Sequence, residues 1–169
     1  MPRNVKSGLI QLSLPMTEGE GSISEIMQAM EDKHIPYIEE AGKKGVQILC
    51  LQEIFNTPYF CPGQDKDWYA SAMPLHSPMM ARMQELAKKY DMAMVVPFYE
   101  KEQAGFLYNT AAVIDADGSI LGKIILQAGQ LGLSGIPDKI CQSGCVHLLR
   151  STLPRWGKSA RIEWSRNRI

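Results

Sequence analysis

The sequence lacks an excess of charge of either sign, and it lacks a long apolar run. Its 18 Lys+Arg and 18 Asp+Glu give a formal net charge of zero, which argues against nucleic acid or an anionic membrane as a partner. No apolar segment approaches the roughly 20 residues that a transmembrane helix needs. The opening MPRNVKSGLIQLSL is too polar for a secretory signal and is interrupted at Pro15. We therefore expect a cytoplasmic protein.

Cysteine is also scarce, and the four cysteines have no regular spacing. They do not make a disulfide framework, so we expect reduced thiols. The segment CQSGCVH brings Cys141, Cys145 and His147 together and suggests at first a metal site or a Cys/His pair. This C-x3-C-x-H spacing lacks the second ligand pair of a zinc site and is too local to close a tetrahedron. We expect no metal and no cofactor; a small metal module is kept only as an alternative, which metal analysis tests.

The charges are unevenly distributed along a chain of single-domain length. Residues 1–123 carry 11 Lys+Arg against 16 Asp+Glu, whereas residues 124–169 carry 7 against 2. Two of the three Trp residues also lie in the second segment. Such a break indicates a domain boundary, a basic tail or a change in how the sequence arose.

The first segment alternates between strand and helix patterns. An apolar strand is predicted over 5–14, followed by a helix that Ser22 caps and that Glu25 completes as a capping box. Pro36 predicts a kink or a new start in that helix, and glycines and lysines around 42–45 predict its end.

Further elements follow in the same order. The run VQILCLQE (46–53) predicts a central strand buried on both faces, and Ser77 with Pro78 predicts a helix that ends at Tyr90. The later elements are strands over 92–100 and 108–116, a turn at Asp117-Gly118, and a strand over 119–124. This order is typical of an α/β fold with a mixed sheet.

Glu53 is the strongest candidate for catalysis. It stands at the carboxyl end of a predicted buried strand, where open α/β sheets hold ligands, and partial desolvation there suits a general base. The alternatives are a carboxylate paired with a lysine or one that caps a loop amide. Cys50, three positions earlier, should point away from Glu53 and be an inert core residue. Cys61 has no histidine nearby in sequence to activate it, and we expect His34 to be solvated.

LCLQEIFNTPYFCP (49–62) resembles the nitrilase superfamily of carbon–nitrogen hydrolases. VKSGLIQLSL, MVVPFYE and YNTAAVIDADGSILGK are similar to the family's first and following strands, and EIFNTPYFCPGQDKDWYASA is closest to the branch that contains β-ureidopropionase. The resemblance covers residues 5–123. It implies a truncated α-β-β-α sandwich with a mixed β-sheet, no cofactor, and a family that forms homo-oligomers.

The resemblance also implies a mechanism with a Cys nucleophile, a Glu general base and a Lys that stabilises the oxyanion. The general base maps onto Glu53. Lys123 matches the lysine of the family's glycine-lysine pair, not the catalytic lysine, and the basic stretch that follows in the family is missing. Cys141 and Cys145 do not stand in the context of the nucleophile. The catalytic Lys and Cys are therefore absent, and we expect this chain to be inactive.

A shift of reading frame accounts for the loss of the nucleophile, and the jump from Lys123 to Ile124 also removes the basic stretch, as a skipped exon, a deletion or an assembly error would. Residues 140–154, ICQSGCVHLLRSTLP, can be encoded so that the frame one base later reads Tyr-Ala-Lys-Val-Gly-Val-Tyr-Ile-Cys-Tyr-Asp, which resembles the family's nucleophile strand. Residues 1–123 are then the N-terminal part of a carbon–nitrogen hydrolase domain. Residues 124–169 are an out-of-frame tail that we expect to be poorly ordered, and the lost half should leave an apolar sheet face exposed.

The expected substrate is a small linear N-carbamoyl amide such as N-carbamoyl-β-alanine, with neither nucleic acid nor membrane as a partner. Two alternatives stay open. One is an amidase for N-carbamoylputrescine or another linear amide, and the other is a non-catalytic partner that dimerises with a full-length homologue.

Overall fold

The computed structural model describes residues 4–16, 19–58, 60, 66–103 and 106–125, together with the backbone of 161–164. Within these ranges, no helix is both long enough and apolar enough to cross a membrane. The elements in chain order are β1 (Asn4–Leu9), α1 (Ile23–Lys43), β2 (Ile48–Cys50), the 3-10 helix η2 (Lys66–Ser71), α2 (Pro78–Tyr90), β3 (Ala93–Gln103), β4 (Phe106–Ile114), β5 (Ile120–Ile125) and β6 (Arg161–Trp164).

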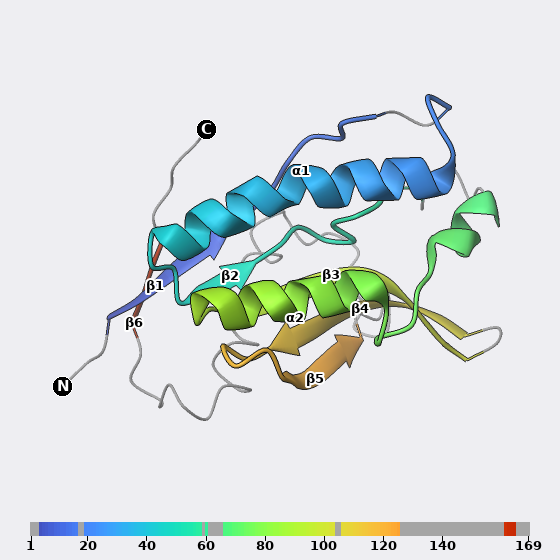
Figure 1. The fold of residues 1–169 in the computed structure, drawn as a ribbon. Helices are drawn as coiled ribbons and strands as arrows, with labels where there is room; N and C mark the ends of the chain where they lie inside the picture. The colour runs from blue at the N-terminus through green and yellow to red at the C-terminus, as the bar shows by residue number, and fades with distance from the viewer. Residues whose placement is uncertain are drawn as a thin grey trace, which may run out of the picture.

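The strands form one mixed sheet in the order β5-β4-β3-β2-β1-β6. The pairs from β6 to β3 are parallel, and β4 and β5 continue the sheet in antiparallel pairing. Figure 1 shows α1 and α2 on the same face of this sheet. The α/β class with a mixed sheet, predicted from the sequence, is confirmed.

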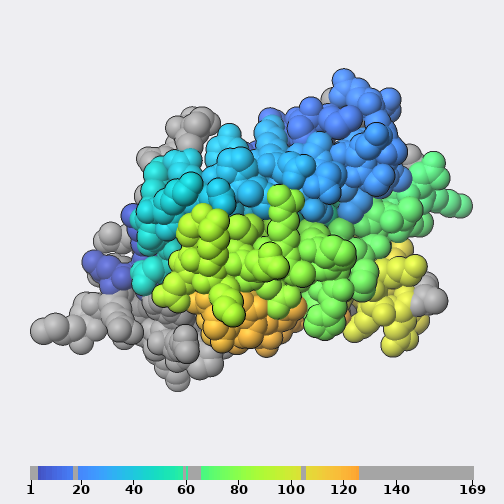
Figure 2. All heavy atoms as spheres, in the orientation of Figure 1, coloured from blue at the N-terminus to red at the C-terminus, as the bar shows by residue number. Residues whose placement is uncertain are grey.

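The two helices lie side by side and form one outer surface (Figure 2). Surface ion pairs join them: Arg82 Nη1 lies 3.1 Å from Asp32 Oδ1, and Lys89 Nζ lies 3.0 Å from Glu39 Oε1. Exposed pairs of this kind contribute at most about 1 kcal/mol each. The helices are therefore held mainly by the apolar contacts beneath them.

The predicted helix ends are confirmed, and of the two predictions at Pro36 a new helix start is excluded. Ser22 and Glu25 form the complete capping box, and Ser77 caps α2. α1 continues through Pro36 as a single 21-residue helix. Met30 and Ile38, before and after the proline, are both fully buried. This burial keeps the two halves of α1 on the sheet and offsets the backbone hydrogen bond that proline removes.

Two predicted strands are shorter than the apolar runs that indicated them. β1 ends at Leu9, and although the Ile10 N–H still donates to Cys50 O, the Leu12 N–H donates to the Gln52 side chain, Oε1, at 2.6 Å. At Leu12 a hydrogen bond to a side chain thus takes the place of the backbone hydrogen bond that a longer strand would make. The three residues of β2 are likewise shorter than the predicted 46–53, because the chain turns soon after Cys50.

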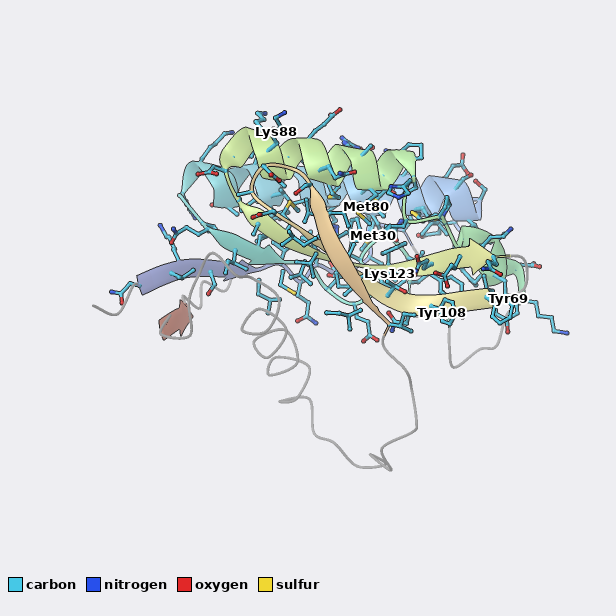
Figure 3. All side chains as sticks on the ribbon, turned by 90° about the horizontal axis from the view of Figure 1, so that it is seen from below. Met30, Tyr69, Met80, Lys88, Tyr108 and Lys123 are labelled. Carbon is cyan, nitrogen blue, oxygen red and sulfur yellow. The ribbon has the colours of Figure 1, made fainter. Side chains whose placement is uncertain are left out.

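The apolar core has two parts, one on each face of the sheet. Under the helices, β2 contributes Leu49, and Met80 of α2 packs in the same cluster; Figure 3 shows Met30 and Met80 between the helices and the sheet. Ile48 and Cys50 of β2 belong to the cluster on the opposite face. β2 is therefore buried on both faces, as the sequence predicted.

The opposite face was expected to be exposed, and that prediction is wrong. Its cluster is buried in the structure and consists of Val5, Ile48, Cys50, Ala93, Val95, Ala111 and Val113, with Ile124 packed against it. These side chains come from five adjacent strands and make one continuous apolar surface. Leaving such a surface in water costs about 25 cal/mol for each Å².

Only part of the segment 124–169 is described. Ile124 and Ile125 end β5, and the backbone of β6 pairs with β1 in parallel. Cys61, Cys141, Cys145 and His147 lie outside the described residues. The predictions of a domain limit at 123 and of poor order in the tail therefore stay predictions.

The turn between β4 and β5 contains Gly118 at a φ of 87° and lies against α2. The Gln84 side-chain amide donates to Gly118 O at 2.7 Å, and a Cβ on Gly118 would stand 2.8 Å from Gln84 O. The Gly118→Ala variant should therefore lose about 2 kcal/mol or more of the free energy of unfolding, from backbone strain and this contact together. Urea denaturation measures the loss.

Substitutions at two other glycines distinguish the effect of backbone strain from that of the contact with Gln84 O. Gly19 has a φ of 91° with open space around it, and Gly122 has open space and no positive φ. Gly19→Ala should lose less than Gly118→Ala, and Gly122→Ala should change little. An equal effect at all three positions would contradict this explanation of the turn.

Candidate active site

Leu51 and Gln52 separate β2 from the turn that contains Glu53, and this turn is fixed to β3. The Phe55 N–H donates to Pro97 O at 3.2 Å, and the Thr57 N–H closes the turn on Ile54 O at 3.1 Å. Ile54 has a φ of 45° and is buried. A left-handed conformation is costly for a β-branched residue, so the surrounding contacts must hold this turn in place.

The Glu53 carboxylate is exposed and accepts a hydrogen bond from Asn109 of β4, whose Nδ2 lies 2.7 Å from Oε1. The expected partial desolvation is therefore absent in the structure. Within the described ranges, its recorded hydrogen-bond donor is a side-chain amide, rather than the lysine or loop amide that were the alternatives. Asn109 is 56 positions away along the chain, so no local sequence pattern indicated the contact.

Cys50 does not point away from Glu53, contrary to the prediction from strand alternation. Asn109 lies two residues before Ala111, which belongs to the same cluster as Cys50, so alternation in β4 places Asn109 on that face. Glu53 reaches Asn109 and therefore lies on the Cys50 side. The physical reason is that β2 ends at Cys50 and the period of two does not extend through the turn. Cys50 itself is a buried core residue, as expected.

A second carboxylate, Glu100 of β3, is buried on the helix side of the sheet. Its Oε2 accepts from Thr110 Oγ1 at 2.8 Å, and its Oε1 accepts from Lys123 Nζ, also at 2.8 Å. Lys123, labelled on β5 in Figure 3, also donates to Glu102 at 2.9 Å. The hydrogen bonds that Lys123 donates to Glu100 and Glu102 raise the pKa of its ammonium group. The sequence interpretation missed Glu100, although its position two residues after the buried Phe98 was a signal.

The other side of the turn rests on α1. Asn56 Nδ2 donates to Glu31 Oε1 at 3.2 Å, and the Phe55 ring packs edge-on against the His34 ring at 5.1 Å between centroids. Burial raises the pKa of the Glu31 carboxyl, although the Asn56 hydrogen bond and the charge of Arg82 oppose the shift.

His34 is fully buried, so the expectation that it is solvated is wrong. It lies one helical turn from both Met30 and Ile38 and shares their sheet-facing side of α1. Its Nδ1 donates to Met30 O at 2.8 Å, and burial lowers the pKa of its imidazole. The polar residues beside it in sequence gave no sign of this, because a helix places neighbours in sequence on different faces.

The described residues do not bring three His, Cys, Asp or Glu side chains together as a metal site. The arrangement that they do form is an open carboxylate at a strand end, which accepts from Asn109, in a turn whose Asn56 donates to the buried Glu31. A carboxylate held by one amide and open to solvent can accept a proton from a thiol or a water placed beside it.

Known proteins share this part of the chain. The sequence model of the carbon-nitrogen hydrolase family matches residues 22–125. β-Ureidopropionase of Arabidopsis thaliana is 39% identical over 126 residues, which are 72% of this chain and 30% of that protein. N-carbamoylputrescine amidase of the same plant is 42% identical over 86 residues, 50% of this chain and 28% of that protein. The chain thus spans less than a third of the length of these relatives.

A solved structure shows the same fold. The carbon-nitrogen hydrolase of Helicobacter pylori G27 superposes with a TM-score of 0.62 at 23% sequence identity, over 80% of this chain and 41% of that one. At this identity the likeness concerns the fold alone. The expected nitrilase-type architecture is confirmed for the part of the fold that this chain contains.

Removing the cation beside Glu100 should destabilise the sheet. The Glu100 side chain is 2% exposed and that of Lys123 is 24% exposed, so Lys123→Met leaves a buried charge without its ionic partner. We expect a loss of about 3 kcal/mol in the free energy of unfolding, measured by urea denaturation. Glu102→Gln, which removes the exposed partner of the same lysine, should cost less than about 1 kcal/mol. Equal losses in the two variants would refute the assignment.

Glu31 should make stability depend on pH. Because its pKa lies above the ordinary value of 4.5 in the folded chain, its favourable contribution is complete below that pH and is lost as pH rises through the raised pKa. Glu31→Gln removes this loss, so the variant should gain stability relative to the wild type between pH 4.5 and neutral pH. Urea denaturation at several pH values measures the difference.

Glu39 on the same helix provides the control. Lys89 lowers the pKa of its carboxyl, so its contribution is present at neutral pH and is lost as pH falls. Glu39→Gln should therefore lose stability relative to the wild type as pH rises. If the two variants changed with the same sign, burial of Glu31 would not explain its effect.

Proposed function

The chain belongs to the carbon–nitrogen hydrolase family, and we propose that it is the part of an amidohydrolase that contributes the general base, Glu53. The observation that carries the proposal is the placement of Glu53 in a fixed turn at the carboxyl end of a central strand. Its carboxylate is open to an incoming group and held by Asn109 at 2.7 Å. General-base catalysis needs a carboxylate in a set position and within reach of the proton that it takes.

The substrate class that we propose is a linear N-carbamoyl amine, with N-carbamoyl-β-alanine as the first candidate. β-Ureidopropionase, 39% identical over 126 residues, supports this choice. In the complete enzyme Glu53 takes the proton of a Cys thiol, and the thiolate attacks the carbamoyl carbon. The amine leaves with that proton, and water then hydrolyses the S-carbamoyl intermediate to CO2 and ammonia, with Glu53 as the base for the water.

We propose that this chain does not complete the reaction by itself. Lys123 is engaged with Glu100 and Glu102, which leaves it in a structural role. Cys50, buried in the core of the sheet, is unsuited to attack a substrate. The reading frame from about residue 124 onward supplies neither the catalytic Lys nor the nucleophile, and the shifted frame would encode the nucleophile across the codons of Leu148 and Leu149.

N-carbamoylputrescine is the second candidate substrate, and it is favoured by one observation: the amidase for it in Arabidopsis thaliana is 42% identical over 86 residues. The two candidates differ in charge, because N-carbamoyl-β-alanine carries a carboxylate and N-carbamoylputrescine an ammonium group. The residues of the candidate site described above do not distinguish these two groups, so the assay must separate the substrates.

The assay compares three proteins on both substrates. The purified chain should release no ammonia above background from either one. A protein with the frame restored after codon 123 and the missing basic stretch, with its Lys, supplied after Lys123 (the restored protein) should hydrolyse N-carbamoyl-β-alanine with the higher kcat/KM. Glu53→Gln in that protein should lower kcat by about 10² to 10⁴.

Glu102→Gln in the restored protein is the matched control. Glu102 is an exposed carboxylate of the same sheet, and it accepts a hydrogen bond from Lys123, which has a structural role. It should keep its rate. Turnover by the unmodified chain would overturn the proposed inactivity, and full activity of Glu53→Gln would overturn the role of Glu53.

A further inference from the structure

We propose that Asn56 and Glu31 are positioning residues that fix the turn carrying Glu53. This inference rests on the proposed role of Glu53 as the general base. It concerns residues that do not touch the reacting atoms and that act through the backbone of residues 53–57. Its basis is the set of contacts that hold a costly backbone conformation at the end of β2.

The turn needs an external hold because its own geometry is unfavourable. Ile54, next to Glu53, has a φ of 45°, and the left-handed region is unfavourable for any residue other than Gly and most of all for a β-branched one. The two neighbours of Ile54 differ in exposure, because Glu53 is exposed and Phe55 is fully buried. A relaxation of Ile54 toward ordinary φ values would therefore redirect Glu53.

β3 holds the turn through a single backbone hydrogen bond, from Phe55 N–H to Pro97 O at 3.2 Å. α1 supplies the second hold. The Asn56 side chain, 1% exposed, donates to the Glu31 carboxylate, which is 8% exposed, at 3.2 Å. The two contacts come from opposite sides of the turn, one from the sheet and one from the helix.

The contact between Asn56 and Glu31 links elements that are 25 positions apart. A buried amide that loses its acceptor keeps its full desolvation penalty, and this penalty is comparable with the strain at Ile54. Loss of the Glu31 acceptor would therefore be enough to let the turn leave its left-handed conformation. The His34 ring adds an apolar contact to Phe55 but does not replace a hydrogen bond.

Several charged and titratable groups surround Glu31. His34 lies one turn after Glu31 on α1, and Asp32 is the next residue after Glu31. The charge of Arg82, which is paired with Asp32, acts on Glu31 from α2. Asn56 is the partner from the turn. Arg82 is paired with Asp32 at the surface. The hydrogen bond that Glu31 accepts therefore comes from Asn56 of the turn and not from Arg82 of α2.

The test uses the full chain and two substitutions at one position. Glu31→Gln keeps an oxygen that accepts from Asn56, whereas Glu31→Leu removes it. Hydrogen exchange of the Phe55 and Thr57 amides reports on the turn, and the Ala93 amide, which donates to Gln47 O at 2.9 Å, reports on the sheet. Glu31→Leu should lower the protection of the two turn amides roughly tenfold or more relative to Ala93, and Glu31→Gln should leave this ratio unchanged.

A second measurement follows Glu53 itself. The side-chain amide resonances of Asn109 report its hydrogen bond to Glu53; they should move in Glu31→Leu and stay in place in Glu31→Gln. Wild-type chain in urea, at a concentration that matches the global stability of Glu31→Leu, is the control for general weakening. Unchanged Asn109 resonances in Glu31→Leu, or the same protection ratio in that variant and the urea control, would overturn the proposal.

These outcomes are independent of hydrolysis. If the turn amides respond as expected and Glu53→Gln remains active in the frame-restored protein, the positioning contact stands and the proposed function fails. If Glu53→Gln is inactive but the turn does not respond to Glu31→Leu, Glu53 remains the base and its turn is held in another way.

Discussion

The short strand β2 and the left-handed turn after it are the constraint on which the candidate site depends. β2 has only three residues, is buried on both faces and ends at Cys50. Ile54 then turns the chain at a φ of 45°. A longer strand would have placed Glu53 according to the period of two, on the helix side with Leu49 and Leu51. The early turn instead brings it to Asn109.

Two consecutive residues of β4 place hydrogen-bond donors on opposite faces of the sheet. Asn109 donates to the exposed Glu53, and Thr110 donates to the buried Glu100 on the helix side. The two carboxylates therefore have different chemistry although they lie near the same strand. Glu100 is neutralised by Lys123 and excluded from water, which suits a structural ion pair. Glu53 keeps an open carboxylate, which suits proton transfer.

Local signals in the sequence predicted most of the fold. The capping box at Ser22, the cap at Ser77 and the Asp117-Gly118 turn depend on contacts within a few residues, and the structure contains all of them. The strand ends, the continuation of α1 through Pro36 and the burial of His34 depend on tertiary packing. The partners of Glu53 and Asn56 lie 56 and 25 positions away, so single-sequence patterns could indicate the functional side chain but not what holds it.

The central claim is that this chain is the Glu53-bearing part of a carbon–nitrogen hydrolase whose nucleophile lies in another reading frame. The most direct test is the nucleotide sequence across codons 120–169. The account predicts that the frame one base later encodes Val-Tyr-Ile-Cys-Tyr-Asp, with the Cys codon spanning those of Leu148 and Leu149. A shifted frame that is interrupted by stop codons, or that encodes no such strand, would contradict it.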